Sequence, residues 1–265
     1  MEKTDLTNFI NLSENPIDNI SWNNEMRNQY NKNGILSLNN FLTEDSIEKL
    51  KEESISKLKY AYFNPKKHNV YLKPVDNSFP KDHPRNINVL SSKGCITDDV
   101  ISKESPLRIV YNSLIFKNFI SFVTDQKKLF PYDDKLSSIN IHYARKGEEL
   151  GWHFDNSSFA ITLMINDVSI GGEFEYTSQI RGDRILKSIE YENIFSVLNN
   201  DFETKISSMK AGGLLLFNGK NSMHRVTRVK SNEIRVLAVL AYNNKAGVSL
   251  SNSAQMTFYG KTGNY

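Results

Sequence analysis

The second half of the chain alternates between apolar and polar positions over short stretches separated by turns. Ile139, Ile141 and Tyr143 alternate with Asn140 and His142, which is the period-two pattern of a half-buried strand. Further apolar stretches predict strands at 159–165, 173–176, 214–217, 226–229 and 234–242. Many short strands of this kind indicate two packed sheets. We therefore predict a mainly β fold with N-terminal helices, namely a double-stranded β-helix (jelly roll, cupin-like).

The first half of the chain is organised differently, with helical spacing interrupted by loops. In chain order we expect a strand at 35–38, a helix from Thr43 to about Tyr60, an irregular loop at 64–84, a helix from Ser105-Pro106 to Val123 and, further on, a short helix near 192–198. Residues 1–20 are polar and unpatterned, so we expect them to pack loosely. The prediction is one domain over 1–265, with helices and loops in 21–136 and the jelly roll in 137–265.

Composition and charge exclude several classes of protein. The 265 residues carry a net charge of +3. This small charge gives no reason to expect nucleic acid or an anionic membrane as a partner. Cys95 is the single cysteine, so a disulfide framework and a zinc–thiolate site within the chain are excluded. No apolar run approaches the roughly 20 residues of a membrane span, and no signal peptide is visible. We expect a cytoplasmic protein, and the oligomeric state is not predicted.

Two stretches carry candidate metal chemistry. His153 and Asp155 form a His-x-Asp pair, and alternate residues of a strand share one face. His224 can complete the site if the fold brings it back. Two histidines and one carboxylate leave three coordination positions open, which suits non-heme Fe(II) and O₂ chemistry. A lone His-x-Asp pair also fits a polar strand facing water, so the spacing of the other residues matters.

Arg235 strengthens the hypothesis that His153, Asp155 and His224 form a metal site. It stands eleven residues after His224, inside the apolar run 234–242. A buried charge without a partner is very costly, and a dicarboxylate cosubstrate held bidentately would supply one. A structural Asp or Glu is the alternative partner. Zinc takes similar ligands, but a zinc hydrolase has no need of a buried arginine at this spacing.

These residues together resemble the Fe(II)/2-oxoglutarate-dependent dioxygenases. The flanking words Glu149–Asn156, Gly171–Phe174, Leu216-Phe217 and Leu240–Tyr242 are similar to the branch that contains the free-amino-acid halogenases and their hydroxylase relatives. The resemblance covers roughly residues 80 to 260. It implies that His153, Asp155 and His224 bind Fe(II), that Arg235 holds the far carboxylate of 2-oxoglutarate, and that O₂ is consumed, with ascorbate as the reductant in assays.

The resemblance also implies a reaction and a class of substrate. Halogenases of this branch have Gly in place of the metal carboxylate, whereas Asp155 is present here, so hydroxylation is expected rather than halogenation. The expected substrate is a small molecule, either a free amino acid or a derivative. Relatives that act on lysine carry Asp directly after the motif, and Asn156 stands there instead, which puts free lysine in doubt.

Three further residues are predicted to contact the cosubstrate. Pro84-Arg85-Asn86 resembles a word of this branch whose arginine holds a carboxylate in the active site, although a solvated loop arginine fits equally. Tyr143 stands ten residues before His153, where related oxygenases place a cosubstrate contact, and a core tyrosine is the alternative. Thr162 can donate its hydroxyl to the 2-oxoglutarate carboxylate that Arg235 is expected to hold. The alternative is that Thr162 is an ordinary β-branched strand residue.

Four residues are candidate substrate contacts. Trp152 and Asn156 flank the ligands and are expected at the rim, and Tyr259 falls where relatives place an aromatic residue over the substrate. His142 can face the site, or be a satisfied core histidine. Two other functions stay open at this point. One is a peptide or protein side-chain hydroxylase of the prolyl type, and the other is a metal-binding jelly roll without catalysis.

Overall fold

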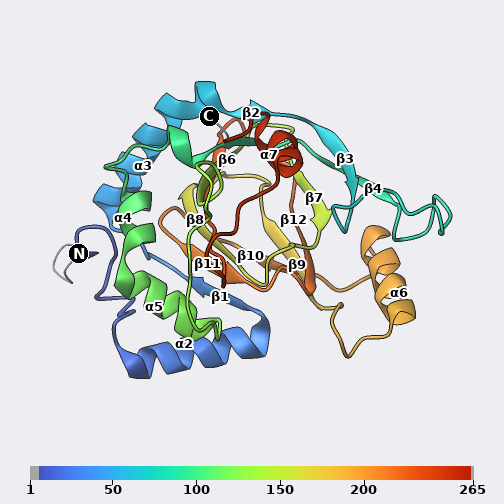
Figure 1. Cartoon of the computed structure of the whole chain (residues 1–265), viewed down its shortest axis with the longest axis horizontal. Coiled ribbons are helices and arrows are strands. Elements are labelled where there is room, and N and C mark those ends of the chain that lie inside the picture. Colours follow the sequence, from blue (N-terminus) through green and yellow to red (C-terminus); the bar gives the residue numbers. More distant parts are fainter. Residues whose placement is uncertain (1–5, 264–265) are drawn as a thin grey trace.

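The framework of the protein is a pair of antiparallel sheets (Figure 1). The computed structural model describes residues 6–263. The larger sheet has the order β1 (Ile35–Leu38), β11 (Leu214–Phe217), β8 (Ala160–Asn166), β13 (Arg235–Leu240), β6 (Ile139–Ala144), β5 (Gly94–Ile96), β2 (Tyr62–Phe63). The smaller sheet has the order β10 (Lys205–Ser207), β9 (Phe174–Gln179), β12 (Ser222–Val226), β7 (Leu150–His153), β4 (Asn88–Ser91), β3 (Lys66–Asn69). From β6 to β13 the chain crosses repeatedly between the sheets, so the predicted double-stranded β-helix is confirmed.

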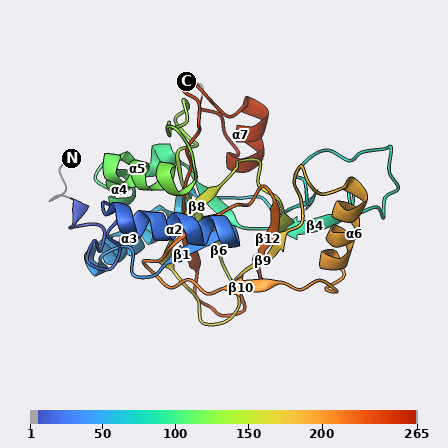
Figure 2. The same ribbon diagram turned by 90° about the horizontal axis from the view of Figure 1, so that it is seen from below.

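Four helices cover the outer face of the larger sheet (Figures 1 and 2). They are α2 (Ile20–Asn33), α3 (Glu44–Lys57), α4 (Pro106–Asn112) and α5 (Leu114–Val123). The apolar side of β6, with Ile141 and Tyr143, shares one hydrophobic cluster with Leu107 of α4 and Phe116 of α5. Burial of these side chains, at about 25 cal/mol per Å² of apolar surface, fixes the helices on this face.

The other helices lie elsewhere on the framework. α6 (Lys187–Leu198) stands on the opposite side from α2–α5 in both views, where Ile194 packs with Trp152 and Phe154 of the smaller sheet. α7 (Asn252–Tyr259) covers the end of the structure near β5 and β6, with Tyr259 buried beside Cys95. Among the helices of residues 6–263, none combines the length and apolar character that a bilayer span requires.

The N-terminal segment is packed more firmly than its composition suggests. Leu6 and Ile10 are fully buried and Ile17 is 1% exposed, all three in the cluster of the larger sheet. The predicted loose packing is therefore wrong for residues 6–20, because a few apolar side chains at wide spacing are enough to anchor it. Residues 1–5 lie outside the described part. That residues 1–265 form a single domain stays a prediction.

Several predicted elements differ in their bounds. The helix expected from 105 to 123 is two helices, because Ser113 ends α4 and caps α5, its Oγ accepting a hydrogen bond from the Phe116 amide at 3.3 Å. The loop expected at 64–84 begins with β3, which pairs with β4. The strand expected at 226–229 is β12, which ends at Val226. Helix α2 was not predicted, because it buries only Asn23, Met26 and Tyr30.

Candidate metal centre and cosubstrate pocket

The strand alternation sorts the residues around the metal centre onto two faces. His153 of β7 lies directly opposite His224 of β12 in the ladder of the smaller sheet. Both imidazoles face the space between the two sheets, as Asp155 does just beyond the end of β7. Trp152 and Phe154, at the intervening positions, face outward and pack with α6. A strand period of two thus brings three ligand types to one face.

The three side chains form a compact set. Their ligand atoms all lie within 4.8 Å of one another. The Asp155 carboxylate is 3.7 Å from Nε2 of His153 and 3.5 Å from Nε2 of His224. Each histidine has its Nδ1 at a backbone carbonyl, His153 at Gly151 (2.8 Å) and His224 at Ser222 (3.2 Å). Those carbonyls accept the Nδ1 proton, which leaves each Nε2 lone pair free for a metal.

The electrostatics keep the ligands in their binding forms. Burial, together with the neighbouring His224, lowers the pKa of His153 to about 3, so that imidazole is neutral at physiological pH. Burial alone would raise the pKa of Asp155, but the adjacent His224 and His153 outweigh burial and lower it. A neutral His153 imidazole and an ionised Asp155 carboxylate are the protonation states that a divalent metal requires of these two ligands.

Two observations show that the site fits a metal. Oδ2 of Asp155 is buried and has no hydrogen-bond partner among the described residues, and such groups are rare unless a ligand satisfies them. Gly219, in the turn before β12, approaches this carboxylate so closely that a Cβ there would collide with it and would lie 2.9 Å from Cε1 of His224. The glycine is required for space, since it is not among the residues with positive φ.

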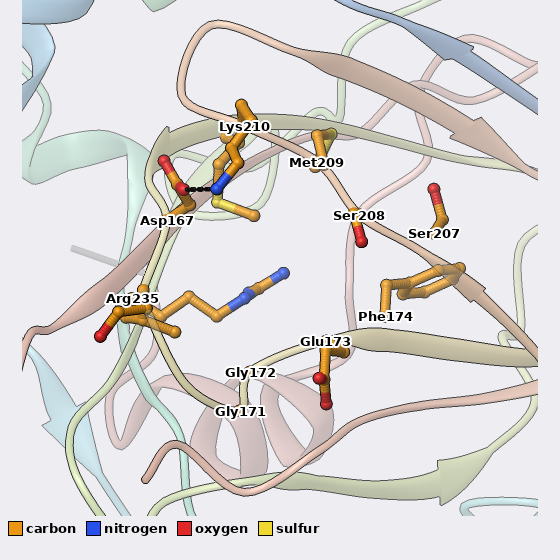
Figure 3. A pocket seen from close by; sticks show the side chains of 13 residues that line it. Asp167, Gly171, Gly172, Glu173, Phe174, Ser207, Ser208, Met209, Lys210 and Arg235 are labelled. Carbon is orange, nitrogen blue, oxygen red and sulfur yellow. Dashed lines mark hydrogen bonds and ion pairs between the residues drawn. The ribbon is translucent and has the colours of Figure 1, made fainter. Parts of the chain in front are cut away.

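Arg235, at the start of β13, lines a cavity of about 180 Å³ between the sheets (Figure 3). The residue is 5% exposed, and its Nε is buried with no hydrogen-bond partner among residues 6–263. Burial lowers the pKa of Arg235 to about 10, opposed by the charge of Asp167. The guanidinium therefore stays charged at neutral pH. Glycine at position 172 leaves room for the Arg235 side chain, because a Cβ there would lie 2.9 Å from Cδ of Arg235.

The acidic groups around this cavity do not neutralise Arg235. Asp167 pairs with Lys210 at 2.9 Å and also accepts a hydrogen bond from the Ala211 amide. Glu173 is exposed and accepts a hydrogen bond from the Thr227 hydroxyl. Among the described residues Arg235 has no ion pair within 4.0 Å. The cavity thus presents a buried cation without an anion, as the carboxylate of a dicarboxylate ligand requires.

Two neighbouring residues of β6, Tyr143 and His142, lie on opposite faces of the larger sheet. Tyr143 is 1% exposed and belongs to the hydrophobic cluster between the larger sheet and the helices α4 and α5. Its hydroxyl donates to the Ser54 carbonyl of α3 at 2.9 Å. It points away from the metal centre, so the predicted cosubstrate contact is wrong for Tyr143. His142 takes the opposite face, where burial lowers its pKa well below the usual value, and the nearby charges of Lys93 and Arg235 lower it further.

The substitution Tyr143→Phe tests whether the Tyr143 hydroxyl stabilises the fold or contacts the cosubstrate. We expect the free energy of unfolding to fall by about 1 kcal/mol, because the Ser54 carbonyl loses its buried donor. The KM for 2-oxoglutarate should stay within about twofold of wild type. Urea denaturation and succinate formation would measure both, and a large rise in KM would restore Tyr143 to the cosubstrate site.

The other candidate residues are scattered. Thr162 lies opposite Val239, four positions along β13 from Arg235, with its hydroxyl buried and without a partner. Arg85 lies over the Tyr71 ring, 5.0 Å from its centroid, and donates to the Pro74 carbonyl. It has no contact with the triad among the described residues. Both assignments stay predictions.

Of the candidate substrate contacts, Trp152 is 5% exposed beneath Arg225, on the outer face of its sheet, and does not line a rim. Asn156 is exposed directly after Asp155. The hydroxyl of Tyr259 donates to Oδ1 of Asn140 at 3.1 Å, which places α7 over the inward-facing side of β6. Sequence reasoning missed Gly219 and Lys93. Lys93 lies 3.0 Å from His142 and belongs to no motif that would reveal it.

Solved structures with this architecture match most of the chain at low identity. An oxidoreductase of the 2OG-Fe(II) oxygenase family from Burkholderia pseudomallei is 12% identical, with a TM-score of 0.55 over 86% of this chain and 93% of that one. HygX from Streptomyces hygroscopicus, solved with nickel, 2-oxoglutarate and hygromycin B, is 15% identical (TM-score 0.57, 86% and 89%). A Pseudomonas putida prolyl-4-hydroxylase is 11% identical (TM-score 0.51, 82% and 96%). A search of curated proteins gives no match.

A double-stranded β-helix with two histidines and one carboxylate on its smaller sheet, and a buried arginine on its larger sheet, defines the Fe(II)/2-oxoglutarate-dependent oxygenase superfamily. Within that superfamily the chain belongs to the family described as HalD, Halogenase D, whose model matches residues 19–258. The resemblance seen in the sequence to the halogenase-containing branch is thereby confirmed.

Proposed function

We propose that this protein is an Fe(II)- and 2-oxoglutarate-dependent hydroxylase of a small substrate, a free amino acid or a derivative. When bound, Fe(II) with 2-oxoglutarate activates O₂, so that 2-oxoglutarate becomes succinate and CO₂ and the second oxygen atom enters a C–H bond. The observation that carries the proposal is the Asp155 carboxylate, whose oxygens lie 3.7 Å from Nε2 of His153 and 3.5 Å from Nε2 of His224.

The chain's own residues divide the work. His153, Asp155 and His224 would hold the metal on one face and leave the other face open. Arg235 would hold the far carboxylate of 2-oxoglutarate, so that its keto acid end is oriented before O₂ arrives. The apolar side chains between the sheets, Met164, Leu215 and Leu237 among them, keep bulk water from the reacting groups.

Hydroxylation is favoured over halogenation because Asp155 fills the third ligand position. Halogenases of the resembling branch have Gly there, and the vacated position accepts a halide. Asn156, exposed beside the centre, stands where lysine-acting relatives have Asp. We therefore propose an amino acid or derivative other than free lysine.

A mass-spectrometric screen tests the function. Purified protein, Fe(II), ascorbate and 2-oxoglutarate would be incubated with a pool of free amino acids and, separately, with proline-containing peptides, while succinate is followed. One added oxygen on an amino acid, with matching succinate, supports the proposal. An oxidised peptide would favour the prolyl-type alternative. Metal binding without iron-dependent succinate would favour a non-catalytic metal-binding module.

The substitution Asp155→Gly should abolish hydroxylation, to below about 1% of the wild-type rate, because the metal loses its only anionic ligand. Oxygen incorporation into the substrate of the wild type is the measurement. Ser157→Gly is the matched control, since it places the same residue two positions away in the exposed loop and should leave the rate unchanged. Hydroxylation at wild-type level in Asp155→Gly would show that Asp155 is not a ligand.

A further inference from the structure

A second cation, Lys93, lies beside β6 and contacts a histidine on the inward face of the larger sheet. Nζ of Lys93, just before β5, is 3.0 Å from Nε2 of His142 on β6. Cys95 lies opposite His142 in the ladder and Leu237 of β13 lies opposite it on the other side. Lys93 shares the face of Cys95 because they are two positions apart. It therefore faces inward, on the same side of the larger sheet as Arg235.

Lys93 lacks an anion. It has no ion pair within 4.0 Å among residues 6–263, and His142 accepts one of the three hydrogen bonds that an ammonium donates. Burial lowers the pKa of Lys93, as expected for a cation without a counter-ion. Lys93 and His142 are nevertheless only half-buried. Both side chains therefore keep some solvent-accessible surface.

The charges around the centre show which kind of ligand is missing. Lys93 and Arg235 contribute two positive charges, and Asp155 contributes one negative charge. A divalent metal adds two positive charges and 2-oxoglutarate adds two negative ones. One positive charge remains, and a partly buried excess of this kind favours binding of a further anion or tighter binding of the cosubstrate.

We propose that Lys93, positioned by His142, binds a carboxylate inside the barrel next to the metal centre. Two sources share that chemistry, namely the keto acid end of 2-oxoglutarate and a carboxylate of the substrate. The inference rests on the proposed function and deepens it, because it assigns the group that would make an amino acid, rather than an uncharged molecule, a good substrate. Lys93 acts by direct contact with the carboxylate, and His142 acts as a positioning residue.

The test compares wild type, Lys93→Met and Lys66→Met. Lys66 is a neighbouring lysine whose ammonium already has partners, because it donates to the Thr257 carbonyl and lies over the Phe258 ring. Its removal therefore controls for long-range charge. Calorimetric titration of 2-oxoglutarate into nickel-loaded protein measures cosubstrate affinity without turnover. Succinate release stimulated by pooled free amino acids, against the same pool as carboxamides, measures recognition of a substrate carboxylate.

A fall of tenfold or more in 2-oxoglutarate affinity, in Lys93→Met alone, would assign the cosubstrate as the source. Unchanged affinity with at least a tenfold loss of preference for acids over amides would assign the substrate. Both properties unchanged, or an equal effect of Lys66→Met, would overturn the proposal. Lys93→Gln serves if Lys93→Met does not fold, as judged by circular dichroism. Failure of the proposed function would appear instead in wild type, as no 2-oxoglutarate binding and no succinate.

Discussion

Replacing Arg235 with alanine should raise the KM for 2-oxoglutarate about 100-fold, with a much smaller change in kcat at saturation. Arg235 is 5% exposed, and no acidic side chain pairs with it in the described part of the chain. Loss of one partner from a desolvated charge pair costs about 2–5 kcal/mol, and about 2.8 kcal/mol corresponds to a factor of 100. Succinate formation at varied 2-oxoglutarate concentration measures the effect.

Arg228→Ala is the matched control for this experiment. Arg228 lies in the connection that leads from β12 into β13, but it is exposed and paired with Glu149, so its removal should change the KM by less than about threefold. Arg235→Lys should fall between the two, since it keeps the charge but loses the bidentate geometry. A wild-type KM in Arg235→Ala would show that 2-oxoglutarate does not bind in this cavity.

The second large effect is expected at a residue with no side chain. Gly219→Ala should weaken metal binding by about 10- to 100-fold, the range found when the groups that orient ligands are disturbed. The added methyl would collide with the Asp155 carboxylate and crowd the His224 ring, and the carboxylate would have to leave its position. Titration of nickel into the metal-free protein, followed by calorimetry, measures the change.

Gly213→Ala provides the comparison. At Gly213 a new methyl would lie 2.8 Å from Cγ of Met209, which is a flexible side chain away from the triad, so metal affinity should not change. Wild-type affinity in Gly219→Ala would mean that Asp155 does not occupy the ligand position.

Local patterns in the sequence were sufficient to predict the chemical groups of the centre. His153 and Asp155 are two residues apart on one extended stretch, so their shared face follows from strand geometry alone. His224 and Arg235 needed only the expectation that two later strands return to the same barrel. The strands at 139–144 and 214–217 were also visible, because each is short, apolar and bounded by turns.

The sequence could not decide which face of β6 meets the site. Its apolar residues suggested one buried side, whereas the structure largely buries both, with Tyr143 against the helices and His142 on the face between the sheets. A polar inner face looks like a solvent face when only the pattern is available. Lys93 was invisible for a related reason, since a lysine near a glycine is ordinary until a fold places it beside an inward histidine.

The facing positions of His153 and His224 on β7 and β12 also tie the metal to the folding of the chain. An unfolded chain holds these side chains far apart, so tight binding exists only once the two strands have paired. A ligand that binds only the folded state adds stability by mass action, about 2.7 kcal/mol when its free concentration is 100 times the Kd. Iron supply would therefore govern the abundance and lifetime of the protein as well as its turnover.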